Sequence, residues 1–168
     1  GGLYAQSTHW RHRNQRYAKE NRWKPETTID PLPNSSADNP AAKTGWKVIS
    51  VPDIRWGRRD IKTVQLLYPS MGKMAAKKAG VDDSWFTDED GAVTEGTSNN
   101  AYIVKGNRII TRALGTDILH GITRAAVLRF AAEAQFEVEE RAFTAAEAQG
   151  ADEAFSTAAS IFVTPVVE

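Results

Sequence analysis

The sequence has 168 residues, of which 41% are hydrophobic and 25% charged, with a formal net charge of +0. These values are typical of a globular chain with one sizeable core. They exclude a disordered chain and a strong overall field for nucleic acid or a membrane surface. The chain has no cysteine, no apolar run near the about 20 residues of a membrane span and no signal peptide, so we predict a cytoplasmic protein without disulfides.

The N-terminal segment is basic and contains spaced aromatic rings. Residues 1–24 hold six Lys or Arg against one acidic residue, a local charge of six minus one, or +5. Single-stranded nucleic-acid binding uses basic and aromatic residues in this way, but the segment matches no known module, so a solvated or partner-facing loop is the favoured interpretation. His9 and His12 lack further spaced ligands, so no metal site is predicted.

The next segment is predicted to be an extended linker that leads into a buried strand. Residues 25–45 contain four prolines together with serine and asparagine. The β-branched residues Val48, Ile49 and Val51 then predict the strand.

The stretch that follows, Val51–Lys62, reads VPDIRWGRRDIK and places charges among apolar residues. Ile54, Trp56 and Ile61 indicate core-forming sequence, which predicts that Lys62 lies at the inner end of a strand beside three arginines. Burial and neighbouring cations lower the pKa of an ammonium group and expose the nucleophilic amine that Schiff-base chemistry requires. The alternative is that the Lys62 stem packs while its amine reaches solvent, as most lysines do.

The middle of the chain predicts one helix and two hairpins. Residues 64–78 have Leu67, Met71, Met74 and Ala75 at helical spacing, Pro69 in the first turn and Gly80 at the C′ position. Asp90-Gly91 and residues 105–107 are turn signals between apolar strands. Glu95 follows the first hairpin. Gly91 and Gly96 have the spacing of a phosphate-binding P-loop, but Thr97 replaces the required lysine, which excludes that loop.

The last third predicts a helix N-terminus that could bind an anion. Gly121-Ile122-Thr123 opens a helix to about residue 134, with free N–H groups and the positive end of the helix dipole. Capping by the Thr123 hydroxyl is the equally supported alternative. Further predicted elements are a half-exposed strand at 136–139, a capping box at 144–147 before a short helix, a small hydroxylated turn at 156–160 and an edge strand at 161–167 that contains Pro165.

Lys62, Glu95, the helix N-terminus and the hydroxylated turn together match the aldehyde, ring nitrogen and phosphate of pyridoxal 5′-phosphate. The segments that support this site occur in the order DIRWGRRDIKTVQLL (53–67), GAVTEGTSNNAYIVKGNRIITR (91–112), LHGITR (119–124), and ADEAFSTAAS with VTPVVE (151–168). In this order the sequence resembles the class IV, or fold-type IV, aminotransferases, and most closely the D-amino acid aminotransferases.

The resemblance implies a role for each candidate residue. Lys62 is similar to the family's Schiff-base lysine, which also moves the proton at Cα. Glu95 is similar to the carboxylate that pairs with the pyridine nitrogen, and Arg55 to the arginine near the ring's phenolic oxygen. The further cofactor-binding residues that it implies are Leu119 on the ring face, Ser98 and Asn100 at the pyridine edge, and Ile122, Thr123, Ala158, Ala159 and Ser160 around the phosphate.

The resemblance also implies an α/β (α+β) fold, with a sheet or pseudo-barrel and flanking helices, and a homodimer. It divides the chain into a remnant of the small N-terminal domain (1–36), a linker (37–45) and a large cofactor-binding domain (46–168), and implies a fragment that lacks most of the small domain and the extreme C-terminus. D-specific members bind the substrate carboxylate with an Arg-x-His in a loop that corresponds to residues 9–17. That pattern is out of register here, so Arg13 or Arg16 is the expected replacement.

The expected function is amino-group transfer between an amino acid, with a D-amino acid such as D-alanine favoured, and a 2-oxo acid. Within the family, the alternatives are a branched-chain aminotransferase, an R-selective amine transaminase and an aminodeoxychorismate lyase. A catalytically inactive fragment is the alternative of another class. No nucleic-acid or membrane partner is expected.

Overall fold

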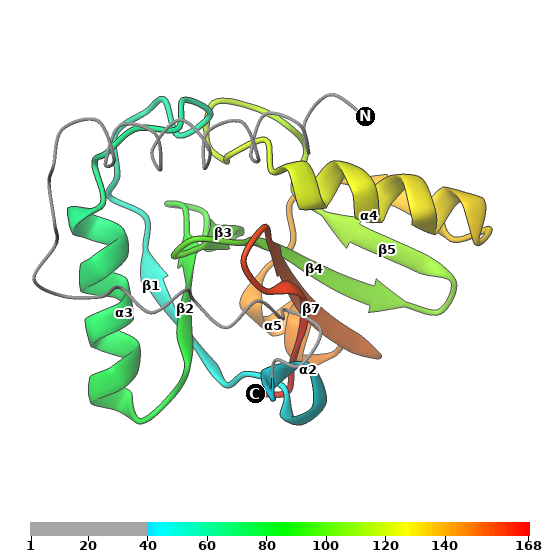
Figure 1. Ribbon diagram of the computed structural model, residues 1–168, viewed down its shortest axis with the longest axis horizontal. Coiled ribbons are helices and arrows are strands. Elements are labelled where there is room, and N and C mark those ends of the chain that lie inside the picture. Colours follow the sequence, from blue (N-terminus) through cyan, green and yellow to red (C-terminus); the bar gives the residue numbers. More distant parts are fainter. Residues whose placement is uncertain (1–39) are drawn as a thin grey trace, which may run out of the picture. The chain divides into compact units, whose positions relative to one another are not determined.

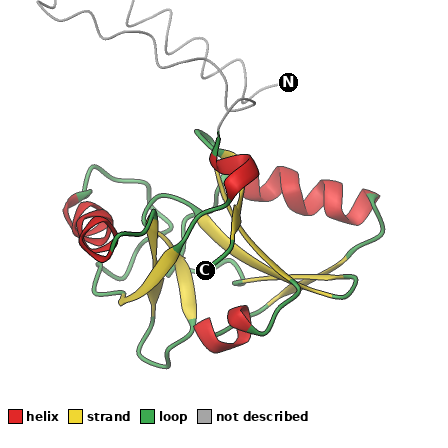
Figure 2. Cartoon of the chain, turned by 90° about the horizontal axis from the view of Figure 1, so that it is seen from below, coloured by secondary structure: helices red, strands yellow, loops and turns green. Residues whose placement is uncertain are grey.

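The structure, a computed structural model, describes residues 40–168, which form a mixed α/β fold with two sheets and flanking helices (Figures 1 and 2). The predicted fold class is therefore confirmed for this part of the chain. The predicted small-domain remnant at 1–36 and the candidate substrate residues Arg13 and Arg16 lie outside the described residues. Among residues 40–168, no helix is long and apolar enough to cross a bilayer.

The first sheet has the strand order β1-β2-β3. Strand β1 is parallel to β2, and helix α3 connects them, because parallel neighbours need a crossover. Strands β2 and β3 form the predicted hairpin, whose turn is closed by Gly91 at a positive φ of 75°. The elements of this half are α2 (Ala41–Thr44), β1 (Val48–Pro52), α3 (Leu67–Ala79), β2 (Asp83–Thr87) and β3 (Val93–Gly96).

The second sheet has the strand order β6-β5-β4-β7-β8. Strands β4 and β5 form the second predicted hairpin, and α4 is the crossover between the parallel strands β5 and β6. Strand β8 ends the sheet, as its Pro165 predicts. The elements are β4 (Asn100–Lys105), β5 (Arg108–Thr111), α4 (Ile122–Glu133), β6 (Glu137–Glu140), α5 (Ala145–Gln149), β7 (Glu153–Ala158) and β8 (Phe162–Val166).

Backbone contacts join the two sheets at two seams. Trp46, which lies two residues before β1, forms a parallel bridge with Val166 of β8, so the chain before β1 lies beside the last strand of the second sheet. At the other seam the N–H of Val93 donates to the carbonyl of Phe143 at 2.8 Å, next to an Ala92–Thr144 bridge. The two sheets therefore curve toward one another, as the expected pseudo-barrel requires.

The alternating side chains of β4 contribute to two separate cores. Ala101 and Ile103 pack with Phe143 and with Trp85 and Val93 of the first sheet, so this cluster joins the two sheets. The intervening residues of β4, Tyr102 and Val104, point to the opposite face and pack with Ile109 of β5 and with Leu128 and Ala131 of α4. Helix α4 therefore covers the outer face of the second sheet (Figure 1). Its apolar residues Leu128 and Ala131 face this core.

The predicted helix ends are largely confirmed. Helix α3 has Pro69 in its first turn and is capped by Gly80 at a positive φ of 78°. At α5 the Thr144 hydroxyl accepts the N–H of Glu147 at 3.1 Å. The reciprocal bond of a capping box is replaced, because the Glu147 carboxylate binds Arg141 at 2.6 and 2.9 Å instead. Helix α4 begins after Gly121 and has no side-chain cap, so the Thr123 capping alternative is wrong.

The prediction that a strand extends to Lys62 is wrong. Strand β1 ends at Pro52, and residues 53–66 are irregular, with Lys62 exposed in this loop. The reason is that the carbonyls of Asp53 and Arg55, which a continued strand would pair in a ladder, instead accept Nη2 of Arg59 at 3.3 and 3.1 Å. Strand β1 is half-buried at the end of its sheet rather than fully buried.

The apolar residues of this loop and of α3 also depart from the prediction. Ile54 is 73% exposed, and on α3 Leu67 and Met74 are 76% and 70% exposed. The helix instead buries Gly72 and Ala76, because small residues allow its backbone to approach the sheet. Within the predicted extended linker, residues 41–44 form the helical turn α2 after Pro40, so this part is not extended. The domain boundaries remain a prediction.

Candidate active site

One cavity of about 890 Å³ brings the predicted site residues together, although they come from distant parts of the sequence. Its walls are the loop after β1, the start of α3, the loop between β3 and β4, the start of α4 and the end of β7. The predicted residues that line it are Arg55, Lys62, Glu95, Ser98, Asn100, Leu119, Ile122, Thr123, Ala158 and Ala159. Ser160 follows in the exposed β7–β8 turn, outside this lining.

Lys62 lines the cavity from the irregular loop and is exposed. Among the described residues, its amine forms no hydrogen bond or ion pair. The lysine side chain has a flexible four-carbon stem, so an amine that is not held by a hydrogen bond or ion pair can turn toward a bound ligand. The structure therefore brings Lys62 to the cavity from a loop and not from the buried strand that the sequence predicts.

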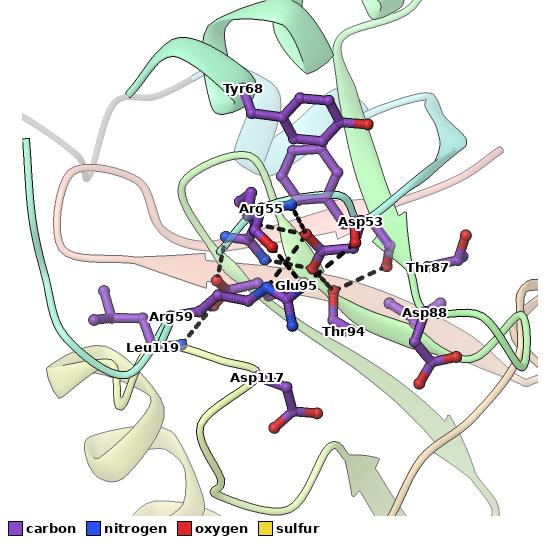
Figure 3. Close-up of polar contacts among 12 residues, drawn as sticks. Asp53, Arg55, Arg59, Tyr68, Thr87, Asp88, Thr94, Glu95, Asp117 and Leu119 are labelled. Atoms are coloured by element: carbon purple, nitrogen blue, oxygen red, sulfur yellow. Dashed lines mark hydrogen bonds and ion pairs between the residues drawn. The ribbon is translucent and has the colours of Figure 1, made fainter. Parts of the chain in front are cut away.

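Glu95 is 5% exposed on β3, and its carboxylate is anchored on both oxygens (Figure 3). Oε1 accepts Nη1 of Arg55 at 2.7 Å. Oε2 accepts the N–H of Leu119 at 2.9 Å and Nδ2 of Asn100 at 3.3 Å. Burial raises the pKa of Glu95, and Arg55 and the Leu119 amide offset part of that rise. Because a carboxylate has about four acceptor positions, one remains for a further donor.

Arg55 joins Glu95 to a second acid that the sequence analysis missed, Asp53, whose side chain is fully buried (Figure 3). Nε and Nη2 of Arg55 donate to the two Asp53 oxygens at 2.8 and 2.7 Å. The Thr94 hydroxyl donates to Asp53 at 2.7 Å, and Nε of Arg59 lies 3.3 Å from it. The signal in the sequence was an acid two residues before an arginine at a strand end, where both side chains share one face.

The charge state of Asp53 is set by this network. Burial alone would raise the pKa of Asp53, but the hydrogen bond and charge of Arg55, with Thr94 and Arg59, outweigh it and lower the pKa below its ordinary value. Asp53 is therefore an anion at neutral pH, and it fixes the direction in which the Arg55 guanidinium points. Arg55 also lies over the Phe86 ring, 4.6 Å from its centroid.

We expect Asp53→Asn to lower the free energy of unfolding by about 3 kcal/mol at pH 7, because it leaves two buried arginines with a single acid. A lowered folded pKa contributes stability above the unfolded pKa of about 3.9, and this contribution is lost as pH falls through the folded value. The difference from the parent chain should therefore shrink below about pH 4. Urea unfolding at several pH values measures it. The exposed Asp90→Asn is the control, and a difference independent of pH would contradict the prediction.

The start of α4 forms the positive end of the cavity. Ile122 and Thr123 line it at the first turn, where backbone N–H groups have no partner within the helix. Gly121 is required here, because a Cβ at this position would overlap Oδ1 of Asn100. Nδ2 of Asn100 donates to the carbonyl of Leu119 at 2.9 Å, so the helix start is tied to β4. Ala158 and Ala159 contribute a second stretch of backbone to the cavity wall.

The family model for class IV amino-transferases matches residues 3–168 of this chain. A D-alanine aminotransferase of Bacillus licheniformis is 38% identical over 167 residues, which are 99% of this chain and 58% of that protein. The chain therefore spans less than three fifths of the length of this relative.

Solved structures show the same fold. A fold IV transaminase of Curtobacterium pusillum matches with a TM-score of 0.69 and 22% identity, over 74% of this chain and 46% of that chain. A branched-chain amino acid aminotransferase of Thermobaculum terrenum, solved in its PLP-form, matches with a TM-score of 0.66 and 26% identity, over 73% of this chain and 42% of that chain.

Proposed function

Because this chain belongs to the class IV aminotransferases, we propose that it is part of a pyridoxal-phosphate-dependent transaminase. The reaction is the transfer of an amino group between an amino acid, with a D-amino acid such as D-alanine favoured, and a 2-oxo acid. The observation that supports this most directly is the cavity that combines an exposed lysine, a buried carboxylate and a helix N-terminus.

The donor set of the cavity fits this cofactor. An aldehyde requires an accessible amine, which Lys62 provides. A protonated ring nitrogen requires a buried anion, and Glu95 has one acceptor position left for it. A phosphate requires backbone N–H groups and a positive dipole end, which Ile122 and Thr123 provide. When bound, the cofactor supplies the electron sink that stabilises negative charge at the substrate Cα.

The chain's own residues then have distinct tasks. Lys62 would hold the cofactor's aldehyde carbon through its amine, and the free amine would move the proton at the substrate Cα. Glu95 would accept the ring N–H and keep that nitrogen protonated, in a site that burial keeps out of water. Arg55, oriented by Asp53, would bind near the ring's phenolic oxygen.

The remaining residues hold the ring and the phosphate in place. Leu119 would pack on the ring face. Ser98 and Asn100 would order the pyridine edge, and Ala158, Ala159 and Ser160 would add backbone N–H groups around the phosphate. Arg13 or Arg16 binds the substrate carboxylate, and the protein acts in the cytoplasm.

The proposal is tested by mixing the purified chain with pyridoxal 5′-phosphate, reducing with borohydride and mapping the modified peptide by mass spectrometry. The expected result is one cofactor per chain, attached to Lys62. Scattered labelling of surface lysines, or none, would show that this chain has the family's sequence without a working pocket, which is the inactive-fragment alternative. A labelled chain is then assayed with D-alanine, L-leucine and an R-amine as donors to separate the transaminase alternatives, and with aminodeoxychorismate to test the lyase.

We also propose that the chain forms a homodimer, and we expect self-association through the apolar residues that α3 exposes. Met74 is 70% exposed and lies outside the cavity lining. Covering such a surface with a second copy removes it from water. Met74→Glu should therefore weaken the dimer, by at least about tenfold in its dissociation constant, since one buried unpaired charge costs more than about 1.4 kcal/mol. Sedimentation measures this, with Lys43→Glu on α2 as the control. A monomeric parent chain would contradict the proposal.

A further inference from the structure

Asp83 is a fully buried acid on β2 that has no task in the proposed reaction. Its carboxylate accepts three hydrogen bonds: the Thr97 hydroxyl at 2.6 Å, Nδ2 of Asn99 at 2.6 Å and the N–H of Ser84 at 2.8 Å. Nζ of Lys73 on α3 lies 3.1 Å away. Hydrogen bonds to an ionised acceptor are about twice as strong as neutral ones, so this carboxylate is a strong anchor.

Two of these bonds come from the residues on either side of Ser98. Thr97 and Asn99 are buried, whereas Ser98 between them is exposed and lines the cavity. The loop is closed further by the N–H of Gly96, which donates to the carbonyl of Asn99 at 2.7 Å. A Cβ at Gly96 would overlap the Asn99 side chain, so a larger residue at position 96 would displace that side chain.

The two ends of this loop are also site residues. Glu95 precedes Gly96 and Asn100 follows Asn99, and their side chains are hydrogen-bonded to each other at 3.3 Å. The cavity residues Glu95, Ser98 and Asn100 thus lie on one short segment, and the buried side chains of Thr97 and Asn99, which also line the cavity, bind Asp83.

We propose that Asp83 is a positioning residue that holds residues 96–99 so that Glu95 and Ser98 face the cofactor. The effect on the cofactor rests on the proposed function, whereas the effect on the loop does not. The competing explanation is that Asp83 only attaches α3 to the sheet. Lys73 supports that explanation, as does the Ser84 hydroxyl, which donates to the carbonyl of Gly72 at 2.7 Å.

Two variants of the full 168-residue chain separate these explanations. Asp83→Ala removes both loop bonds, and Lys73→Met removes the ion pair to α3 while it leaves the loop bonds intact. Amide hydrogen exchange without cofactor is the first measurement, because it reports local opening segment by segment. The second is the dissociation constant of pyridoxal 5′-phosphate, measured by quenching of tryptophan fluorescence.

The expected result for Asp83→Ala is exchange that is about tenfold faster in residues 96–100 than in the parent chain, with little change in α4, and cofactor binding weakened about tenfold, equivalent to about 1.4 kcal/mol. Lys73→Met should leave both within about twofold of the parent, since the half-exposed Lys73 is only one of four partners and the three hydrogen bonds to Asp83 remain. If Asp83→Ala does not fold, Thr97→Val with Asn99→Leu removes the same two bonds while retaining Asp83. Because Thr97 and Asn99 also line the cavity, this variant is tested by hydrogen exchange alone, and the same faster exchange in residues 96–100 is expected.

Faster exchange spread evenly over the sheet, or equal effects of the two variants, would overturn the proposal. Faster exchange in the loop with unchanged cofactor binding would overturn the link to the cavity. A parent chain that binds no pyridoxal phosphate would contradict the proposed function, and the exchange data would still decide whether Asp83 holds the loop.

Discussion

Replacing Lys62 with alanine is expected to abolish the borohydride-stable adduct with pyridoxal phosphate and to lower any amino-group transfer by this chain by at least about 10²- to 10⁴-fold. The variant loses both the nucleophile and the group that moves the Cα proton. The remaining cavity residues, Glu95 and the start of α4 among them, still bind the ring and the phosphate. Binding should therefore weaken much less than turnover. Peptide mapping measures the adduct, and coupled oxidation of the 2-oxo acid product measures the rate.

The matched control is Lys78→Ala, which removes an exposed lysine from the last turn of α3, outside the cavity lining. In this variant the borohydride-stable adduct should still form at Lys62, and the rate of amino-group transfer should equal that of the parent chain. The stability of both variants should stay within about 0.5 kcal/mol of the parent, because each changes an exposed side chain. An adduct that persists in the Lys62 variant at parent stoichiometry would place the reactive amine elsewhere.

The resemblance to the class IV aminotransferases implied most of the cavity residues, and local signals located the elements that carry them, whose ends the topology brings together. Both hairpins have turn residues that determine their position, Asp90-Gly91 and Gly106, so the place of Glu95 between them could be predicted. The start of α4 followed from Gly121 and the apolar pattern behind it. These are local signals, and each was sufficient for its own element.

The environment of Lys62 could not be predicted in this way. Ile54, Trp56 and Ile61 suggest a buried strand, but what they contact depends on where the chain turns after Pro52. That turn depends on Asp53, which gathers Arg55 and Arg59 around one carboxylate across a stretch of irregular backbone. The two-residue spacing of Asp53 and Arg55 indicates their pairing, but the contact of Arg59 with Asp53 follows no period, so no sequence pattern predicts where the chain turns.

The orientation of α3 was missed for a related reason. Hydrophobic spacing favours burial of Leu67, Met71 and Met74, yet the helix packs through Gly72 and Ala76. A Cβ at Gly72 would lie 3.0 Å from both the Phe86 ring and the Thr97 methyl, so close approach selects the small face. A pattern of apolar residues predicts which face of a helix is apolar, but it does not distinguish a face that packs on the chain's own sheet from one that is exposed.

Glu95→Gln is expected to lower the rate of amino-group transfer by about 10²- to 10³-fold, the usual cost of removing one preorganised electrostatic contact. Glutamine keeps the size of the side chain but cannot hold a proton's charge on the ring nitrogen. Its amide would also direct an N–H toward either Arg55 or the Leu119 amide, both of which are donors to Glu95. Steady-state kinetics of the parent chain and the variant measure the loss.

The distribution of that loss between turnover and binding distinguishes the proposed role from simple damage to the pocket. An anion beside the ring nitrogen would keep that nitrogen protonated, and a protonated ring is the better acceptor for the electron pair left at Cα, so loss of the anion should raise the barrier to proton removal more than it weakens binding. The turnover number should therefore fall far more than the affinity for pyridoxal phosphate, and Lys62 should still be labelled by borohydride. Glu153→Gln, which changes an exposed acid on β7, should match the parent chain. Equal losses of affinity and turnover would mean that Glu95 mainly holds Arg55 and Leu119 in place, and that the ring nitrogen has another partner.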